Sequence, residues 1–532
     1  MKAWIDLKTH WRADLTAGFI LSLIALPLCI GIAGASIGNG SLSPAVSGLI
    51  AAVIGGVLVS RLSGTHVAIH GPAAGLIVIV QHGIDSLGEG DAKVGFQRFL
   101  AAMIVAGALQ ILMGLLRLAR YAALFPVNVI HGMLAAIGII IISKQVHVAL
   151  GVTPQAKSPL GLYAEVPQSV SNMNPEIAVI GFAALAVMIF FLVAPWRSLK
   201  KIPAPLVAVI VAAILGVLFD LQHEHHYFFM GRDYAIGERF LVTLPASVLA
   251  ALPRPDFSII TSPASLASIF SIFFVASLES LLSANAVDKL DPEKRVSNLN
   301  KEIIANGLAN VLLGAIGGIP IIAEIVRSSA NIANGARTQW SNFFHGIFLA
   351  LFLFLIPGTI HLIPNAALAG ILILVGFRLA HPAEFRHAFD AGAEQLAIFL
   401  TTLLVTLAED LLVGVAAGLV VKLLILVLRG VKLREVFRLR ASVQESGTEI
   451  NVKPEGSIIF TNLFSLTDRL AAFDKSKHLT IDFAGVRYID HTSMAALVTL
   501  RQEAEAEGRA LNMLNIDLLK PYSSHPAAAR RA

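Results

Sequence analysis

The sequence has few charged residues and a single cysteine. Only 14% of its 532 residues are Asp, Glu, Lys or Arg, whereas a soluble domain carries about 25%. Cys29 lies in an apolar run without a partner, which excludes a disulfide-stapled secreted scaffold. The C-terminal part lacks a Gly-rich phosphate-binding motif, so we expect neither an ATPase nor a cofactor. The net charge of +5 comes from Lys and Arg in short loops, and we predict no nucleic-acid partner.

The residues that are abundant are apolar ones. Hydrophobic residues make up 56% of the chain, and the mean hydropathy is +0.75. Charge is uneven, because residues 431–532 hold 26 of the 75 charged side chains. The sequence therefore predicts a lipid-embedded part followed by a water-exposed part.

Apolar runs long enough to cross a bilayer, which takes roughly 20 residues, recur along the first 430 residues. We find them at 14–35, 44–60, 95–119, 124–143, 177–194, 204–220, 265–287, 302–317, 341–358, 364–380, 396–408 and 410–429. Two shorter stretches, 70–80 and 317–331, begin with Gly-Pro and Gly-Gly-Ile-Pro and are predicted to be half-helices. Such interrupted segments in corresponding places of two halves are typical of a transporter binding site.

Loop charges predict the topology. Lys and Arg are concentrated in alternate loops, so the positive-inside rule places both termini in the cytoplasm and requires an even number of crossings. Fourteen segments satisfy this as seven plus seven, with the second half inverted. No small-residue cleavage site follows the first span, so we expect it to be retained.

The sequence predicts four regions. A transmembrane domain covers 1–430, with inverted repeats at about 14–220 and 265–429, and a basic linker covers 431–440. An α/β domain follows at 441–519, and 520–532 is predicted to be disordered. In the α/β domain we predict strands at 450–452, 457–460, 479–483 and 510–514 and helices at 463–473 and 493–507.

The chain resembles the SulP anion transporters, the bacterial relatives of prestin and pendrin. The resemblance lies in residues 14–35 with Ala-Leu-Pro-Leu, 63–75 with Gly-Pro, 279–282 (Glu-Ser-Leu-Leu) and 306–339, in family order. The tail, with Asp482-Phe-Ala-Gly-Val and Tyr488-Ile-Asp, resembles a STAS domain. The resemblance implies a core and a gate domain, a homodimer, and an anion site between the third and tenth segments.

Helix physics supports an anion site independently. Helices that start near Ala73 and Ile325 and face each other would both offer unpaired N–H groups and about half a positive charge. The candidate substrate-binding residues are Ala73, Ala74, Gly75, Val326, Arg327 and Ser328. Alternatively, both Gly/Pro motifs are only packing kinks in buried helices.

Two charged residues in apolar surroundings are further candidates. Arg327 should face a cavity or a carboxylate, or else lie at the cytoplasmic interface, because a buried guanidinium is costly. Glu279 is a candidate coupling residue, because a buried carboxylate can take up a proton or a cation. In family members the matching acidic residue is associated with H⁺ or Na⁺ coupling, with Ser283 one turn further on as a cation ligand. A plain ion pair between Glu279 and Arg327 is the alternative.

Two residues depart from the family pattern. Glu324 precedes the tenth segment at a position that is usually small and neutral, and could join the coupling site or act as the N-cap of its own helix. His70 replaces the usual Ser before Gly-Pro, as a titrating or a hydrogen-bonded structural histidine.

Two other groups of residues have weaker functional signals. Thr492 matches the position that is phosphorylated in STAS relatives of the anti-sigma-antagonist type, and a structural or docking role is the alternative. Asp220 and residues 223–226 (His-Glu-His-His) form a cluster in an outward loop. We interpret that cluster as solvated loop and predict no metal site.

The sequence as a whole predicts a secondary transporter rather than an enzyme. We expect a multi-pass protein of the inner membrane that moves a small inorganic anion, sulfate or bicarbonate, by alternating access coupled to H⁺ or Na⁺. Its partners would be membrane lipid, a second copy of the chain and a cytoplasmic protein bound by the STAS domain. The alternatives are C4-dicarboxylate transport by the same site, a nucleobase transporter of the same fold, and a passive anion channel with a STAS signalling module.

Overall fold

The computed structural model describes residues 2–38, 43–119, 126–156, 158–196, 202–245, 252–446, 449–463, 466, 478–506 and 511–532. It divides into two units, Met1–Ala123 with Ile137–Leu379, and Leu124–Ala136 with Ala380–Ala532. Each unit has its own apolar core, formed around residues such as Leu49 and Leu349 in the first and Val452 and Phe483 in the second.

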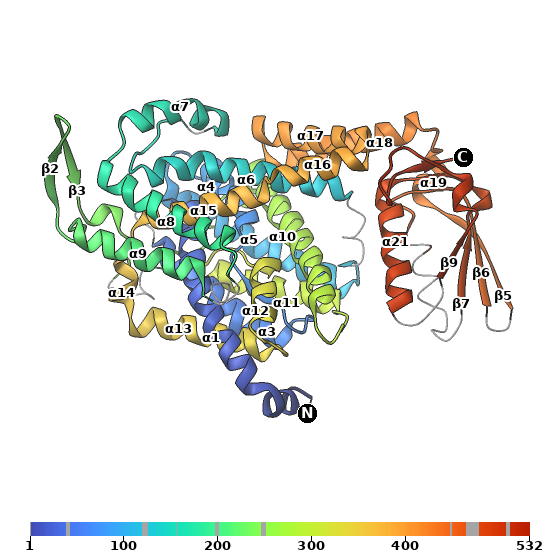
Figure 1. Cartoon of the computed structure of the whole chain (residues 1–532), viewed down its shortest axis with the longest axis horizontal. Helices are drawn as coiled ribbons and strands as arrows, with labels where there is room; N and C mark the ends of the chain where they lie inside the picture. Colours follow the sequence, from blue (N-terminus) through green and yellow to red (C-terminus); the bar gives the residue numbers. More distant parts are fainter. Residues whose placement is uncertain are drawn as a thin grey trace. The chain divides into compact units, whose positions relative to one another are not determined.

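The first unit is almost entirely helical (Figure 1). Its α-helices are α1 (Lys2–Ile37), α2 (Pro44–Ile54), α3 (Ser60–Leu62), α4 (Ile77–Leu87), α5 (Ala92–Leu115), α6 (Val127–Ala149, shared with the second unit), α7 (Pro159–Ser171), α8 (Pro175–Val193), α9 (Ala204–Leu218), α10 (Pro263–Leu290), α11 (Leu299–Ile316), α12 (Ile325–Ala333), α13 (Trp340–Leu355), α14 (Pro357–His361) and α15 (Asn365–Leu379). It also contains a π-helix η1 (Gly55–Val59), 3-10 turns η2 (Ala74–Leu76) and η5 (Glu238–Phe240), and strands β1 (Ile69–Gly71), β2 (His225–Phe229), β3 (Arg232–Ile236) and β4 (Ile322–Glu324).

The helices confirm the membrane fold that hydropathy predicts. Within the described residues, eight helices are long and apolar enough to cross a bilayer, and four shorter apolar helices accompany them. Each full-length apolar run of the sequence corresponds to a helix. The two predicted half-helices are α4, with 11 residues, and α12, with 9, both far shorter than the roughly 20 residues of a full span.

Two close helix crossings are related by the inverted repeat. Gly107 of α5 and Gly307 of α11 pack so tightly that a Cβ on either would come within 2.8 Å of the other's carbonyl oxygen. Gly56 of η1 and Gly346 of α13 make a similar backbone-to-backbone contact. Since α5 and α13 are the fourth segments of their halves, and η1 and α11 belong to the second segments, the two crossings are equivalent. Small residues at such crossings favour helix association in lipid.

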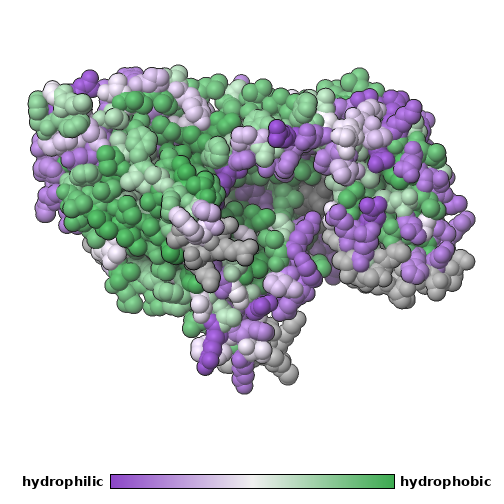
Figure 2. Space-filling view, in the orientation of Figure 1, coloured by the Kyte–Doolittle hydropathy of each residue, from purple (hydrophilic) through white to green (hydrophobic). Residues whose placement is uncertain are grey.

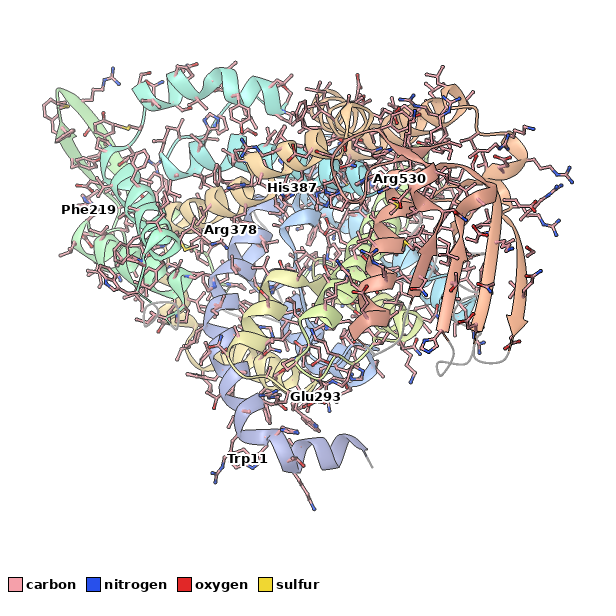
Figure 3. All side chains as sticks on the ribbon, turned by 45° about the vertical axis from the view of Figure 1, so that its right-hand side comes forward. Trp11, Phe219, Glu293, Arg378, His387 and Arg530 are labelled. Carbon is pink, nitrogen blue, oxygen red and sulfur yellow. The ribbon has the colours of Figure 1, made fainter. Side chains whose placement is uncertain are left out.

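Loops that the positive-inside rule assigns to one side of the membrane meet at one end of this unit. Asp14 of α1 accepts a hydrogen bond from the backbone N–H of Arg337 at 2.8 Å, and Arg295 donates to the Arg337 carbonyl at 2.8 Å. Trp11 and Glu293 lie at this same end (Figure 3). Segments more than 300 residues apart in the chain therefore share one end of the helices, as the predicted topology requires.

The outer faces of α8 and α9 are apolar. Phe182, Val193 and Leu218 are 57%, 69% and 72% exposed. In Figure 2 hydrophobic surface covers the region that these helices occupy in Figure 1. Apolar surface of this extent fits contact with lipid, and the chain is a multi-pass membrane protein.

The second unit joins three apolar or amphipathic helices to an α/β domain. Its described helices are α16 (Pro382–Ala391), α17 (Ala393–Ala408), α18 (Leu411–Leu428), α19 (Leu433–Phe437) and α21 (His491–Ala506). Its strands are β5 (Arg440–Ser446), β6 (Glu449–Ile458), β7 (His478–Asp482), β8 (Val486–Ile489), β9 (Leu511–Leu514), β10 (Lys520–Pro521) and β11 (Arg530–Arg531). They form one sheet in the order β10-β11-β8-β6-β7-β9, with β5 on β6.

Several details of the C-terminal part differ from the sequence prediction. The predicted strands 450–452 and 457–460 are one strand, β6, which continues through a register shift at Gly456, where φ is +88°. The stretch 520–532 is not disordered, because β11 pairs with β8 and with β10. The linker 431–440 contains α19. An ion pair between Glu435 of α19 and Arg487 of β8 links this helix to the α/β domain. Most of the predicted helix 463–473 lies outside the described residues.

Candidate functional site

A two-stranded ribbon holds the starts of the two short helices together. β1 runs antiparallel to β4, with His70 opposite Ala323. β1 leads through Pro72 and Ala73 into η2 and α4, whereas β4 leads directly into α12. Because a strand of three residues is only about 10 Å long, the ribbon keeps two helix N-termini from opposite halves close to each other.

Neither helix start is capped by its own side chain. Ala73 and Glu324 occupy the N-cap positions in extended conformation, and neither makes a side-chain capping hydrogen bond. The interpretation of Glu324 as a residue that satisfies its own helix is therefore wrong. Ala73, Ala74 and Gly75 are small and buried. Uncapped N–H groups beside small residues are what an anion requires at a helix N-terminus.

Arg327 lies in the first turn of α12 and is 1% exposed. Its Nε donates to Glu324 Oε2 at 2.7 Å, and its Nη1 lies 3.4 Å from Cys29 Sγ of α1. Its Nη2 donates to the carbonyl of Pro72, beside the start of the other short helix. The cation is thus inside the protein, not at the interface, and its ion-pair partner is Glu324 rather than Glu279.

The remaining residues of the tenth segment lie on two faces of α12. Ser328 is fully buried. It accepts a hydrogen bond from the N–H of Ile69 at 2.9 Å and donates one to the Glu324 carbonyl at 2.5 Å, so it links α12 to both strands of the ribbon. Val326 is 56% exposed, so its side chain lies outside this buried cluster.

Glu279 of α10 is 8% exposed and lies against the first short helix. A Cβ added to Gly75 would be 2.0 Å from its Oε1, so the carboxylate occupies the space that a side chain at residue 75 would need. Oε1 has no hydrogen-bond partner in the described part of the chain. Ser283 is half-buried one turn further along α10, without a hydrogen bond to a described residue. Glu279 is therefore a buried acid next to a helix N-terminus, and one of its carboxylate oxygens accepts no hydrogen bond from a described residue.

We expect Gly75→Ala to lower anion uptake at least tenfold, because the new methyl group would displace the Glu279 carboxylate or the start of η2. Uptake into proteoliposomes, normalised to the amount of reconstituted monodisperse protein, would measure this. Gly358→Ala is the matched control, since nothing lies within 4 Å of its added Cβ. Equal uptake by both variants would show that the Glu279–Gly75 contact has no functional importance.

His70 belongs to a buried network that sequence reasoning missed. Its Nδ1 lies 3.1 Å from Asn342 Nδ2, a donor, so Nε2 carries the proton and donates to Glu302 at 2.7 Å. Glu302 also accepts from Asn306 at 2.9 Å and from Ser63. His70 is thus a hydrogen-bonded structural histidine that ties the ribbon to α11 and α13. Glu302 and Asn306 are one turn apart on α11, but Glu302 stands at the start of an apolar run, where a charged residue looks interfacial.

Thr492 lies in the first turn of α21 and is 6% exposed. Its Oγ1 has no hydrogen-bond partner in the described residues. The neighbouring Asp490 accepts the N–H of Ser493 at 2.8 Å and lies 3.0 Å from Lys422 Nζ of α18, with both charged groups buried. A hydroxyl in this position is not accessible to a kinase unless the domain opens, which favours the structural role.

The outward-loop cluster splits into separate pairs. His223 Nδ1 lies 2.7 Å from Asp220, and His226 Nδ1 lies 2.7 Å from Asp233 on the neighbouring strand. The hydrogen bond to Asp220 raises the pKa of His223. Exposed pairs of this kind are typical of a solvated hairpin.

Comparisons with known proteins identify the same two parts of the chain. A model described as the sulfate permease family matches residues 11–402, and a STAS domain model matches residues 440–517. The bicarbonate transporter BicA of Synechocystis is 26% identical over 530 residues, covering 95% of this chain and 89% of that protein. YvdB of Bacillus subtilis, named as a candidate sulfate transporter, is 26% identical over 510 residues, covering 92% and 88%.

The structure is also similar to solved structures of transporters. The transmembrane domain of a cyanobacterial bicarbonate transporter BicA superimposes with a TM-score of 0.64 at 26% identity, covering 77% of this chain and 97% of that one. The murine Solute Carrier 26 family member A9 anion transporter, solved in the inward-facing state, shares the fold at 15% identity with a TM-score of 0.65, covering 97% and 89%. The broken-helix membrane fold, the C-terminal sheet and these matches agree: the chain belongs to the sulfate permease family of transporters and ends in a STAS domain.

Proposed function

We propose that this chain is a secondary transporter that moves a small oxyanion, sulfate or bicarbonate, across the inner membrane with both termini in the cytoplasm. The observation that carries the proposal is the pair of uncapped helix N-termini, held by the β1–β4 ribbon beside the buried Arg327. The proposed anion ligands are backbone N–H groups at Ala73–Gly75 and at Val326–Ser328, with Arg327 supplying positive potential. The relatives named for bicarbonate and sulfate transport support this substrate class.

Charge balance supports coupling to H⁺ or Na⁺. Arg327 forms an ion pair with Glu324 at 2.7 Å, which leaves Glu279 as the carboxylate without an ion-pair partner in the cluster formed by these three residues. If Glu279 is ionised, an incoming anion meets excess negative charge next to Gly75 in a low-dielectric environment. When Glu279 binds a proton or a cation, the helix dipoles dominate and the anion can bind. Substrate and coupling ion would then bind together.

The ribbon suggests which parts move together during alternating access. β1 and β4 are fastened to α10 by Ser280, which accepts the N–H of Ala323 at 3.1 Å, and to α11 by the His70–Glu302 contact. Small separate motions of the two helix N-termini would break these buried hydrogen bonds. We propose that the site moves as one body relative to its surroundings, and that two copies of the chain form a homodimer.

The alternatives make different demands. A C4-dicarboxylate could use the same N–H groups, so only uptake separates it from sulfate and bicarbonate. A nucleobase carrier would need side-chain hydrogen bonds to a heterocycle, and a STAS domain is not expected in one. A passive channel with a signalling STAS domain would conduct without a cation gradient.

The test of the proposal is uptake of labelled sulfate, bicarbonate and fumarate into proteoliposomes with and without H⁺ and Na⁺ gradients. Accumulation of one anion above its equilibrium level, only when a gradient is imposed, is the expected result. Gradient-independent flux that stops at equilibrium would instead identify a channel. Absence of flux for all three anions, in protein that is monodisperse, would contradict the proposal.

Removal of the STAS domain by truncation after Arg440 should leave anion binding intact, because all the proposed ligands lie in the first unit. The truncation also removes Asp490 and Phe460, which lie against Lys422, and so uncovers this ammonium group and the apolar residues beside it. We therefore expect lower solubility or stability of the truncated protein without loss of the anion site. Anion binding to monodisperse truncated protein measures the outcome. Loss of binding there would place the STAS domain in the site.

A further inference from the structure

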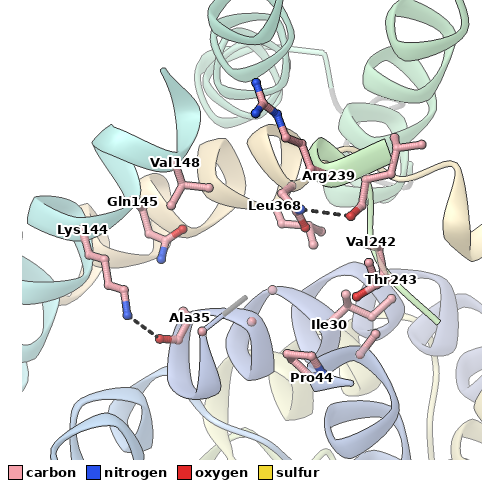
Figure 4. A pocket seen from close by; sticks show the side chains of 16 residues that line it. Ile30, Ala35, Pro44, Lys144, Gln145, Val148, Arg239, Val242, Thr243 and Leu368 are labelled. Carbon is pink, nitrogen blue, oxygen red and sulfur yellow. Dashed lines mark hydrogen bonds between the residues drawn. The ribbon is translucent and has the colours of Figure 1, made fainter. Parts of the chain in front are cut away.

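A cavity of about 290 Å³ lies in the first unit beside the proposed site. The C-terminal part of α1, the starts of α2 and α15, α6 and the segment 239–243 line it (Figure 4). None of its lining residues is acidic, whereas Lys144 and Arg239 are both basic. Its size is near the lower end for ligand pockets, which suits a small ion rather than a large organic molecule.

Neither cation of the cavity forms a salt bridge with a described residue, although the negative charge of Asp85 on α4 acts on Lys144 from beyond salt-bridge distance. Lys144 Nζ lies 3.3 Å from the carbonyl oxygen of Ala35, near the end of α1. Arg239 donates to the Ala235 carbonyl at 2.9 Å and lies over the ring of Phe240. Carbonyl contacts fix the position of these groups but leave their charge in place. The cavity therefore has a positive potential.

A glutamine side chain on α6 also lines the cavity. Gln145 is 5% exposed and lines the cavity beside Lys144, and its side chain makes no hydrogen bond to a described residue. Figure 4 shows its amide group between Lys144 and Val148, on the cavity side of α6. The amide is open to the cavity, so an occupant can form a hydrogen bond with it. A Gln side chain donates through its NH₂ group, which an oxyanion accepts.

The cavity lies next to the broken-helix site along α1. Cys29 of α1 contacts Arg327 at 3.4 Å, and Ile30, Gly31 and Gly34 line the cavity. The five helical steps from residue 29 to residue 34 span only about 7.5 Å. The cavity is also at the C-terminal end of α1, away from the end where Asp14 and Arg337 meet.

We propose that this cavity is a second anion site, on the side of the membrane opposite the termini. It captures a small oxyanion through Lys144, Gln145 and Arg239 and delivers it to the site at Arg327. This inference rests on the proposed function, since it assumes an anion substrate. It adds a place where the anion binds before it reaches the helix N-termini.

Directional kinetics test the proposal with the full-length protein in proteoliposomes of defined orientation. The Lys144→Gln/Arg239→Gln variant should raise the KM for sulfate or bicarbonate at least tenfold from the side opposite the termini. It should change KM from the other side and kcat by less than twofold. Arg232→Gln, which removes an exposed arginine of β3 that does not line the cavity, is the matched control. An unchanged KM, or equal changes from both sides, would overturn the second site.

Equilibrium binding separates failure of this site from failure of the proposed function. In an Arg327→Ala background, which removes the positive charge at the helix N-termini, labelled sulfate or bicarbonate should still bind weakly at the cavity. Adding Lys144→Gln and Arg239→Gln should lower this residual binding at least tenfold. If Arg327→Ala alone abolishes binding of both anions, the second site does not exist, even if the wild type transports.

Discussion

Replacing Arg327 by alanine should lower anion uptake at least tenfold, equivalent to about 1.4 kcal/mol or more. The substitution removes the buried positive charge beside the two helix N-termini and leaves Glu324 as an uncompensated negative charge at the same place. It also removes the hydrogen bond to the Pro72 carbonyl, which links α12 to the start of the other short helix. Initial uptake rates over a range of substrate concentrations, at matched amounts of protein, would measure the loss.

A charge-balanced variant separates the roles of Arg327. Arg327→Met combined with Glu324→Gln keeps the volume and neutrality of the pair but has no guanidinium. If the guanidinium attracts the anion, this variant should remain at least tenfold impaired. Wild-type uptake by it would show that Arg327 serves only as the counterion of Glu324. Arg327→Lys should recover little, because one ammonium group cannot reproduce the planar fork that reaches Glu324, Cys29 and Pro72.

Features that depend on local patterns could be predicted from the sequence. Hydropathy located the membrane helices because a bilayer requires long apolar segments with no unmet backbone hydrogen bonds. The Gly-Pro and Gly-Gly-Ile-Pro interruptions located α4 and α12, since proline ends or begins a helix and cannot sit inside one at no cost. The positions Ala73–Gly75 and Arg327–Ser328 follow from these helix starts, and the structure brings them together.

Features that depend on contacts between distant segments could not be predicted in this way. Glu302 and His70 are 232 residues apart, and only the folded chain shows that they form a hydrogen bond. The β1–β4 ribbon is invisible to a search for strand patterns, because each strand has three residues. The Glu324–Arg327 pair, by contrast, has the i,i+3 spacing that favours an ion pair on a helix. The same position of Glu324, directly before the helix, also fits an N-cap residue, so the sequence alone does not distinguish the two roles.

The prediction of disorder for residues 520–532 was wrong. The composition of 520–532, with several Ala, Ser and Pro, resembles a disordered tail. Its strand β11 nevertheless pairs with β8, and Ala528 and Ala529 are buried. Edge pairing supplies the backbone hydrogen bonds that such a short segment cannot form by itself.

Glu279→Gln should uncouple uptake from the H⁺ or Na⁺ gradient while anion exchange continues. Glutamine has the shape of the protonated acid and fits the same space against Gly75, so the site stays neutral throughout the cycle. Accumulation above equilibrium should fall at least tenfold, because anion binding no longer requires an accompanying ion. Counterflow of labelled against unlabelled anion, which needs no gradient, should keep a substantial part of the wild-type rate.

Glu324→Gln is the matched control, because it removes a carboxylate from the same cluster with a different expected result. It leaves Arg327 without its ion-pair partner, so the site gains positive charge, and we expect tighter anion binding with slower release rather than loss of coupling. Coupled accumulation should therefore persist at reduced turnover. If gradient-driven uptake instead survives in Glu279→Gln and is lost in Glu324→Gln, the coupling ion binds at Glu324, and the carboxylate at Gly75 only fills space beside the helix start.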